Sequence, residues 1–311
     1  MTDQADSTAD VVVIGGGPAG LSAALWCDEL GLSSVLLEQE SSYGGQLHSI
    51  YNPIQNYLGL AAANGTEMLS RFEESVRSRN FVRRSGTKAT AVDVQRLEVH
   101  LDEPLRESLR CRAIILATGV RRRTLDIPGE LQFRGKGIVE SGARDKHLMS
   151  GKRVLIIGGG DAAFENALLL SEFAASVSVA YRRAHPSART TFVDAAVRLG
   201  NVKLMPETVA TRIAGDSFVE AVALADSSGR TWDEPVDAVL IRVGVEPNSE
   251  LVRQSLEVDE FGYVWVDHLG RTSCPNIYAV GDVANRCSPT LSTAVGTAAT
   301  TAKAIFGLIK T

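Results

Sequence analysis

Two copies of one pattern constrain this chain more than any other feature of its sequence. The first copy begins with an apolar run at residues 11–14, passes through the glycine turn GGGPAG and continues as a helix-like segment. A second apolar run then ends on Glu38. Strand, glycine turn, helix, strand and acid in this order are what a dinucleotide-binding βαβ unit requires. The sequence therefore predicts an α/β protein with a Rossmann-like unit near its N-terminus.

The residues of this first turn have separate predicted tasks. Gly15 allows the tight turn, Gly17 lets the backbone approach a pyrophosphate, and Gly20 lets the helix lie close to its strand. The helix N-terminus offers unpaired N–H groups to phosphates. Glu38 stands about 20 residues after Gly15, where a carboxylate accepts hydrogen bonds from a ribose. An ordinary glycine-rich turn is the alternative, but we expect a dinucleotide to contact Gly15, Gly17, Pro18, Ala19, Gly20 and Glu38.

The same pattern recurs later in the chain and carries a different charge. An apolar run leads into the glycines at 158–160, a helix-like segment and another strand-like run. Where the first copy has Glu38, the second has Tyr181 followed by Arg182 and Arg183. A carboxylate would repel a ribose 2′-phosphate, whereas arginines bind one through charge-assisted bonds. An arginine face open to solvent is the alternative, but we expect an NADPH site that includes Gly158, Gly160, Asp161, Ala162, Arg182, Arg183 and Arg189.

The composition argues against several classes of partner. The chain has 311 residues, 44% hydrophobic and 22% charged, with a formal net charge of −5. The length predicts about two domains, and the charge argues against a general nucleic-acid or anionic-membrane surface. No apolar run approaches the roughly 18 residues that span a bilayer. Residues 1–10 are polar and acidic, which predicts a frayed leader and not a signal peptide. We therefore expect a cytoplasmic protein.

The cysteines and histidines predict neither a metal site nor a catalytic triad. The four cysteines stand at positions 27, 111, 274 and 287, with no CxxC pair and no Cys/His cluster of metal-ligand spacing. Cys27 and Cys111 lie in apolar runs and are expected to be buried. Cys274 is expected to be partly exposed. The five histidines form no recognisable triad.

Periodicity predicts the remaining elements. Apolar residues at helical spacing indicate an amphipathic helix over residues 65–80. The last segment, 291–309, is rich in Ala, Thr and apolar residues, and its composition predicts a mostly buried helix. Strands are expected at residues 89–94, 97–101, 111–118, 218–225, 235–243, 263–266 and 276–280.

Together these pieces resemble the low-molecular-weight thioredoxin reductases, within the flavoproteins that carry two dinucleotide-binding domains. The resemblance covers nearly the whole chain, and its motifs occur in the family's order. They are GGGPAGLSAA, YGGQL with IQNY, ILATGVRRRTLDIPGE, GKRVLIIGGGDAA, VAYRR, VGVEPN and IYAVGDVA.

The resemblance implies both the architecture and the cofactors. It places an FAD-binding domain at residues 1–119 and 245–311, with an NADPH-binding domain inserted at 120–244. Each domain would be a Rossmann-like, three-layer βαβ unit, and the protein would be a homodimer. The N-terminus of the last helix would stabilise the anionic reduced flavin. By the same resemblance the FAD site includes Gly45, Gln46, Asn56, Thr118, Gly119, Gly281 and Asp282, with Asp282 on the ribitol chain.

One departure from the family matters more than the matches. The family carries Cys-x-x-Cys-Asp ahead of its second glycine-rich strand, and here the two cysteine positions hold Ser141 and Arg144, followed by Asp145. Neither serine nor arginine forms a disulfide or a thiolate nucleophile. We therefore expect NADPH to reduce FAD, and the flavin to pass its electrons to an external acceptor rather than to thioredoxin by the family's route. No catalytic residue is assigned.

The sequence leaves the electron acceptor open. It is a small molecule or an electron-carrier protein, and the run Arg121–Arg123 either docks an acidic carrier or forms a solvated, ion-paired cluster. A ferredoxin/flavodoxin–NADP reductase-type enzyme is one alternative, and a non-catalytic flavoprotein redox sensor is another. Cys287 is the cysteine best placed to approach the flavin and His48 the best-placed histidine, although ordinary loop positions are expected for both.

Overall fold

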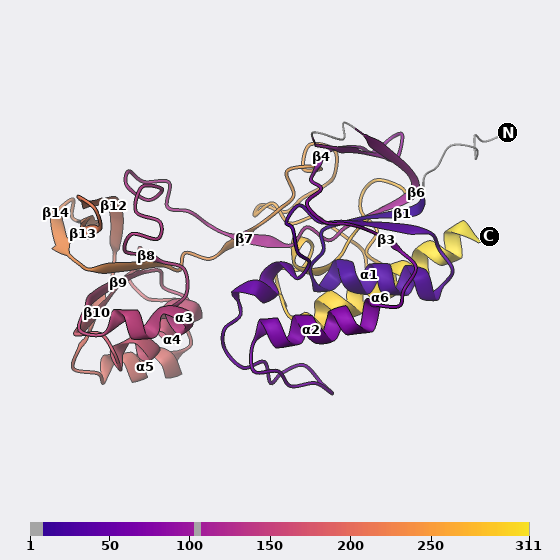
Figure 1. The fold of residues 1–311 in the computed structure, drawn as a ribbon. Helices are drawn as coiled ribbons and strands as arrows, with labels where there is room; N and C mark the ends of the chain where they lie inside the picture. Colours follow the sequence, from indigo (N-terminus) through magenta and orange to yellow (C-terminus); the bar gives the residue numbers. More distant parts are fainter. Residues whose placement is uncertain (1–8, 103–106, 311) are drawn as a thin grey trace. The chain divides into compact units, whose positions relative to one another are not determined.

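The computed structural model describes residues 9–102 and 107–310 (Figure 1). The described chain divides into two compact units. Unit 1 comprises Met1–Arg121 and Glu246–Thr311, and unit 2 is the intervening segment Arg122–Val245. The strands β7 (Val120–Arg122) and β16 (Val245–Pro247) lie at the two crossings between the units and pair with each other. The first and last segments of the chain therefore build one unit together.

A largely parallel sheet forms the centre of unit 1. Its strands run in the order β3-β2-β1-β6, and the second half of β6 also pairs with β17. The first half of β6 pairs antiparallel with β5, which pairs with β4. The strands are β1 (Ala9–Ile14), β2 (Ser34–Leu37), β3 (Val82–Arg84), β4 (Ala89–Asp93), β5 (Glu98–Leu101), β6 (Ser108–Leu116) and β17 (Ile277–Ala279). β1 is apolar almost throughout because both faces of the sheet are covered.

Helices cover one face of this sheet, and strands and loops cover the other. The helices α1 (Pro18–Glu29), α2 (Gly65–Val76) and α6 (Leu291–Ile309) lie beside one another (Figure 1). Leu36 and Ile115 of the sheet pack in the core on that side. On the other side Ile114 packs in a core with Val99 of β5. The unit therefore has three layers around the parallel strands.

The sequence around α6 fixes where this helix begins. The Thr290 hydroxyl accepts a hydrogen bond from the Thr293 amide, and the Thr293 side chain accepts one from the Thr290 amide, which is a reciprocal cap. The helix has the predicted bounds, but the prediction that it is mostly buried is wrong. Only the face that includes Ala298 and Ile305 is buried, since the helix lies at the surface with α1 beneath it.

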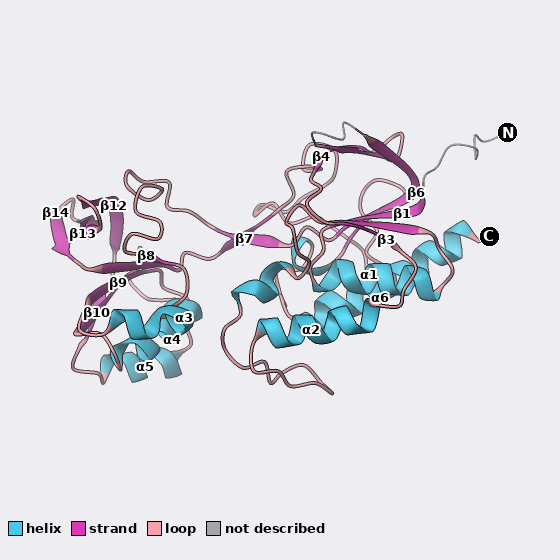
Figure 2. Cartoon of the chain, viewed as in Figure 1, coloured by secondary structure: helices cyan, strands magenta, loops and turns pink. Residues whose placement is uncertain are grey.

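Unit 2 is built around a second parallel sheet, in the order β11-β10-β9-β15-β8. The helices α3, α4 and α5 lie on one side, and the antiparallel sheet β12-β13-β14 adds residues to the core on the other (Figure 2). The strands are β8 (Ile138–Val139), β9 (Arg153–Ile157), β10 (Ser176–Ala180), β11 (Val202–Met205), β12 (Thr208–Gly215), β13 (Val219–Asp226), β14 (Thr231–Pro235) and β15 (Ala238–Ile241). The helices are α3 (Gly142–Asp145), α4 (Asp161–Ser171) and α5 (Thr190–Val197).

The structure corrects several predicted elements. The strand predicted over 235–243 is divided, because β14 ends at Pro235, which has no amide hydrogen to donate, and β15 begins at Ala238. In the described chain, segment 263–266 makes only an isolated bridge between Val264 and Val258. The predicted leader is too long because Ala9 already belongs to β1, while residues 1–8 lie outside the described ranges.

Two candidate nucleotide-binding sites

The first glycine turn is packed so closely that larger residues do not fit. Gly15 has φ +108°, and a Cβ on it would lie 2.4 Å from the carbonyl oxygen of Ala117. A Cβ on Gly20 would lie 1.8 Å from the carbonyl oxygen of Gly15. Gly17 precedes α1 without any side-chain cap, and Pro18 occupies the first turn. The turn therefore lies tightly against the residues that follow β6, while the helix N-terminus carries no capping side chain.

Glu38 is buried and holds the turn in place. It follows β2, and its Oε2 accepts a hydrogen bond from the Gly16 amide at 2.7 Å. Its Oε1 accepts one from the Glu40 amide at 2.9 Å. A carboxylate oxygen has a second lone pair, so both oxygens keep capacity for a ligand hydroxyl. The predicted contact between Glu38 and a ribose stays a prediction.

Two further predicted segments lie against this turn. A Cβ on Gly45 would lie 3.2 Å from the Cα of Gly17, so the short helix η1 (Gly45–Ser49) touches the turn. A Cβ on Gly281, which has φ +68°, would lie 2.8 Å from the Cβ of Ala19. Burial raises the pKa of the adjacent Asp282. The structure thus brings the first turn, η1 and the residues after β17 together, with a carboxylate whose burial disfavours its charge.

The segment after β6 is held by Asn248, a residue of the VGVEPN motif to which the sequence assigns no role of its own. The Thr118 hydroxyl donates to the Asn248 carbonyl at 2.6 Å, and the Asn248 side chain donates to the Thr118 carbonyl at 2.8 Å. The Asn248 amide donates to the Gly119 carbonyl at 3.0 Å. Gln46 donates to the carbonyl of Val120, in the same segment. An asparagine after a short strand is a weak sequence signal, so the role of Asn248 was not predicted.

Two predicted loop residues have ordinary surroundings. Asn56 is exposed in the loop between η1 and α2. His48 bonds within its own loop, with its Nε2 2.8 Å from the Tyr43 carbonyl oxygen.

Cys27 and Cys111 are buried as predicted, Cys274 is partly exposed as predicted, and Cys287 is exposed. Whether any of these residues faces a flavin stays a prediction.

Unit 2 contains a cleft of about 700 Å³ at the carboxyl ends of its parallel strands. Its lining includes the second glycine turn and Asp161-Ala162 at the start of α4. Gly158 has φ +145°, and a Cβ on it would lie 2.1 Å from the Arg242 carbonyl oxygen. Gly160 precedes α4 without a side-chain cap. In open α/β sheets in general, nucleotides bind in a crevice at this end of the strands.

The arginines predicted for the 2′-phosphate differ in their surroundings. Arg182 and Arg183 are exposed and line the cleft, and within the described ranges neither is paired with a carboxylate. Arg189 instead pairs with Asp161 at 2.8 Å and stacks on Phe192. The Arg189 backbone amide bonded to Asp161 holds the pKa of this carboxyl below its usual range. Arg189 and Asp161 therefore bond each other, and their predicted nucleotide contacts stay predictions.

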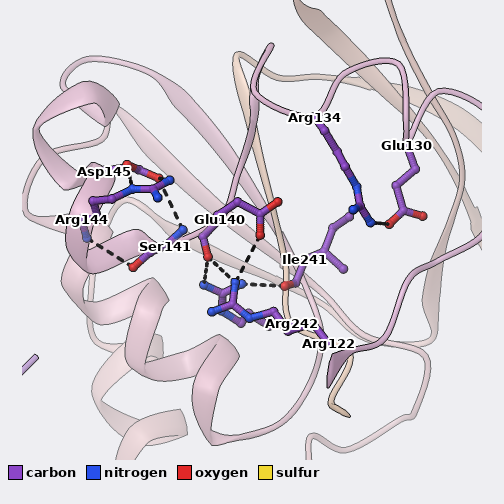
Figure 3. Close-up of polar contacts among 9 residues, drawn as sticks. All are labelled: Arg122, Glu130, Arg134, Glu140, Ser141, Arg144, Asp145, Ile241 and Arg242. Carbon is purple, nitrogen blue, oxygen red and sulfur yellow. Dashed lines mark hydrogen bonds and ion pairs between the residues drawn. The ribbon is translucent and has the colours of Figure 1, made fainter. Parts of the chain in front are cut away.

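The segment at 141–145 holds a helix cap and an ion pair (Figure 3). The Ser141 hydroxyl accepts from the Arg144 amide at 3.3 Å and caps α3. The Arg144 guanidinium binds the buried Asp145 carboxylate through two bonds, of 2.7 and 2.9 Å. These bonds hold the pKa of Asp145 below its usual range. The sequence prediction had named these three residues without foreseeing that they bond one another.

Three charged groups beside this segment were missed as site residues. The Arg122 and Arg242 side chains both donate to the backbone carbonyl of Glu140 (Figure 3). Arg122 also lies 3.5 Å from the Glu140 carboxylate. The signal available in the sequence was a charged residue directly after an apolar strand, which describes Arg242 at the end of β15. Arg122 was noted only as part of an arginine run.

Comparison with known proteins settles the family. The sequence pattern of the pyridine nucleotide-disulphide oxidoreductases matches residues 9–301. This chain belongs to that family. A thioredoxin reductase of Peptoclostridium litorale is 31% identical over 283 residues, covering 88% of this chain and 88% of that protein. A 34.2 kDa protein in the rubredoxin operon of Clostridium pasteurianum is 28% identical over 292 residues, covering 92% of each.

Solved structures agree with the sequence comparison. The thioredoxin reductase of Lactococcus lactis in its FR conformation matches with a TM-score of 0.84 and 28% identity, covering 97% of this chain and 99% of that one. The thioredoxin reductase of T. acidophilum matches with a TM-score of 0.82 and 27% identity, covering 97% and 99%. This family member is therefore a flavin-dependent pyridine-nucleotide oxidoreductase of the thioredoxin reductase type.

Two features are absent from the described residues. Among them, no helix has both the length and the apolar character needed to cross a bilayer. The same part of the chain brings together no group of three or more side chains suited to hold a metal ion.

Proposed function

We propose that this protein oxidises NADPH and passes the electrons through FAD to an external acceptor without a protein disulfide. The observation that carries the proposal is the segment Ser141–Asp145, which we align with the redox disulfide of the thioredoxin reductases. There, Ser141 caps a helix and Arg144 pairs with a buried carboxylate. Neither side chain can form a disulfide or relay electrons.

The residues of unit 1 fit FAD. The glycine turn leaves the first turn of α1 without a capping side chain, which suits a pyrophosphate. Glu38 can accept from a ribose hydroxyl while it keeps its bond to Gly16. Burial raises the pKa of Asp282. A ribityl hydroxyl that donates a hydrogen bond to this carboxylate would offset part of the cost of its burial. FAD, when bound, supplies a two-electron acceptor for hydride.

The residues of unit 2 fit NADPH. The turn at Gly158 and Gly160 and the start of α4 suit the pyrophosphate. Arg182 and Arg183 line the same cleft and are free to bind a 2′-phosphate, the group that NADPH carries and NADH lacks. The chain's own contribution is to bind and orient the nucleotide, because hydride transfer itself needs no acid or base from the protein.

The two buried cysteines are unsuited to act as a thiol relay. Burial raises the pKa of the Cys27 and Cys111 thiols to about 12, so neither is a thiolate at neutral pH.

The arginine run at residues 121–123 provides no cluster of three free charges for an acidic carrier. Arg121 pairs with Glu246 at 2.7 Å and with Glu250 at 2.6 Å. These contacts favour the ion-paired interpretation of the run and leave the acceptor open.

The test is an anaerobic stopped-flow experiment on the purified flavoprotein. Mixing with NADPH should bleach the flavin absorbance rapidly, and NADH should do so more slowly. Reoxidation is then followed with quinones, oxygen, low-molecular-weight disulfides, a ferredoxin and a flavodoxin. A protein that cannot be loaded with FAD, or a bound flavin that NADPH never reduces, would refute the proposal, and the latter would favour a non-catalytic redox sensor.

A further inference from the structure

Charged groups follow one another along the carboxyl edge of the sheet in unit 2. In the strand order β10-β9-β15-β8, Arg182 follows β10 and the glycine turn follows β9. Arg242 follows β15 and Glu140 follows β8. The glycine turn therefore separates the Arg182-Arg183 end of the edge from a second charged group at its other end.

The second group carries more positive than negative charge. Arg242 donates to the Glu140 carbonyl at 2.9 Å and to the Ile241 carbonyl at 2.7 Å, and both acceptors are neutral. Arg122 shares the Glu140 carbonyl and lies 3.5 Å from the Glu140 carboxylate (Figure 3). Two guanidiniums thus share one nearby carboxylate. Both arginines line the cleft, so this excess charge acts on whatever the cleft holds.

The pKa of Arg242 agrees with this description. Burial, together with the neighbouring Arg122, lowers the pKa of Arg242 to about 10. The guanidinium is therefore still protonated at neutral pH. Its charge is retained but poorly neutralised, which increases its effect on another charge nearby.

The orientation of the bound nucleotide rests on the proposed function. A dinucleotide whose 2′-phosphate lies at Arg182 and whose pyrophosphate lies at the glycine turn places its nicotinamide half toward β15 and β8. The oxidised nicotinamide ring carries a positive charge that the reduced ring lacks. We propose that Arg122 and Arg242 make the cleft bind NADPH in preference to NADP⁺, with Glu140 reducing this preference. The pair then speeds the exchange of spent nucleotide for fresh NADPH.

The test measures binding rather than turnover. Isothermal titration calorimetry on the oxidised, FAD-loaded protein gives Kd for NADP⁺ and for 1,4,5,6-tetrahydro-NADP, which has an uncharged ring and transfers no hydride. Wild type should bind the reduced analogue more tightly. The preference is measured as the Kd for NADP⁺ divided by the Kd for the reduced analogue. Arg242→Gln and Arg122→Gln should each lower this ratio about three- to tenfold, because NADP⁺ then binds more tightly. Arg242→Lys should keep the ratio, because it keeps the charge.

A variant with the opposite sign guards against a folding artefact. Glu140→Gln keeps the backbone carbonyl that both arginines use and should enlarge the ratio. Arg153→Gln is the matched control, because Arg153 lies at the amino end of β9, opposite to the cleft, where it pairs with Asp237 at 2.7 Å. It should leave the ratio unchanged.

The remaining outcomes each overturn something specific. If Arg242→Gln weakened both ligands equally, the arginine would be a phosphate contact and the inference would be wrong. An unchanged ratio in all the Arg122, Arg242 and Glu140 variants would also overturn it. If wild type bound neither ligand, the proposed function would fall, and this inference with it.

Discussion

The packing of the first glycine turn makes a quantitative prediction for Gly20→Ala. The added Cβ would lie 1.8 Å from the Gly15 carbonyl oxygen, whereas ordinary contacts lie at 3.4–4 Å. The atom in the way belongs to the backbone, so the turn itself must move rather than a side chain. Overpacking a core usually costs about 1–3 kcal/mol, and this variant should lose at least the upper end, about 3 kcal/mol. Urea unfolding followed by circular dichroism, with FAD in excess for every variant, measures the loss.

The chain offers a matched control for this experiment. Gly296 also lies inside a helix, and a Cβ on it would meet nothing within 4 Å. Gly296→Ala should therefore gain about 0.5–1 kcal/mol from helix propensity alone. If Gly20→Ala unfolded within about 0.5 kcal/mol of wild type, the turn would be soft and the packing argument wrong.

Three further predictions test charged groups. Arg182→Ala should weaken NADPH by roughly tenfold or more and NADH much less, measured by reductive titration, and an equal loss would remove the 2′-phosphate role. Arg144→Leu should lower the unfolding free energy by about 1–3 kcal/mol at neutral pH, because Asp145 stays buried without this partner. The loss should shrink in urea titrations as pH falls from about 4 toward the lowered pKa of Asp145, because the wild-type carboxyl also becomes protonated there. Arg153 lowers the pKa of Asp237 to about 2, so Asp237→Asn should destabilise at neutral pH and the difference should fade as pH drops from about 4 toward 2. A constant difference in unfolding free energy between wild type and Asp237→Asn across that pH range would contradict the ion-pair explanation.

The repeated nucleotide units were predictable because local sequence determines them. Residues 11–38 encode strand, turn, helix and strand without help from distant parts of the chain. Only glycine fits where the backbone of the turn approaches Ala117 so closely, so its pattern survives as a readable signal. The same holds for the bounds of α6, which a local cap fixes at Thr290.

Contacts between distant segments were not predictable in this way. Arg242 meets Glu140 only because β15 and β8 are neighbours in the sheet, although these residues are far apart in the sequence. Asn248 holds Thr118 across a similar separation. The degree of burial of α6 also depends on which elements pack beside it, and so its Ala-, Thr- and apolar-rich composition led to an overestimate of its burial.

The discontinuity of unit 1 has a consequence for protein synthesis. β6 and α1 emerge from the ribosome before unit 2, whereas β17, which pairs with β6, and α6, which packs on α1, emerge only after all of unit 2. Unit 2 is contiguous, so its contacts can form as soon as its own residues have been made. The apolar surface that α1 presents to α6 stays uncovered until α6 has been synthesised, and nascent chains that stop before α6 will expose it.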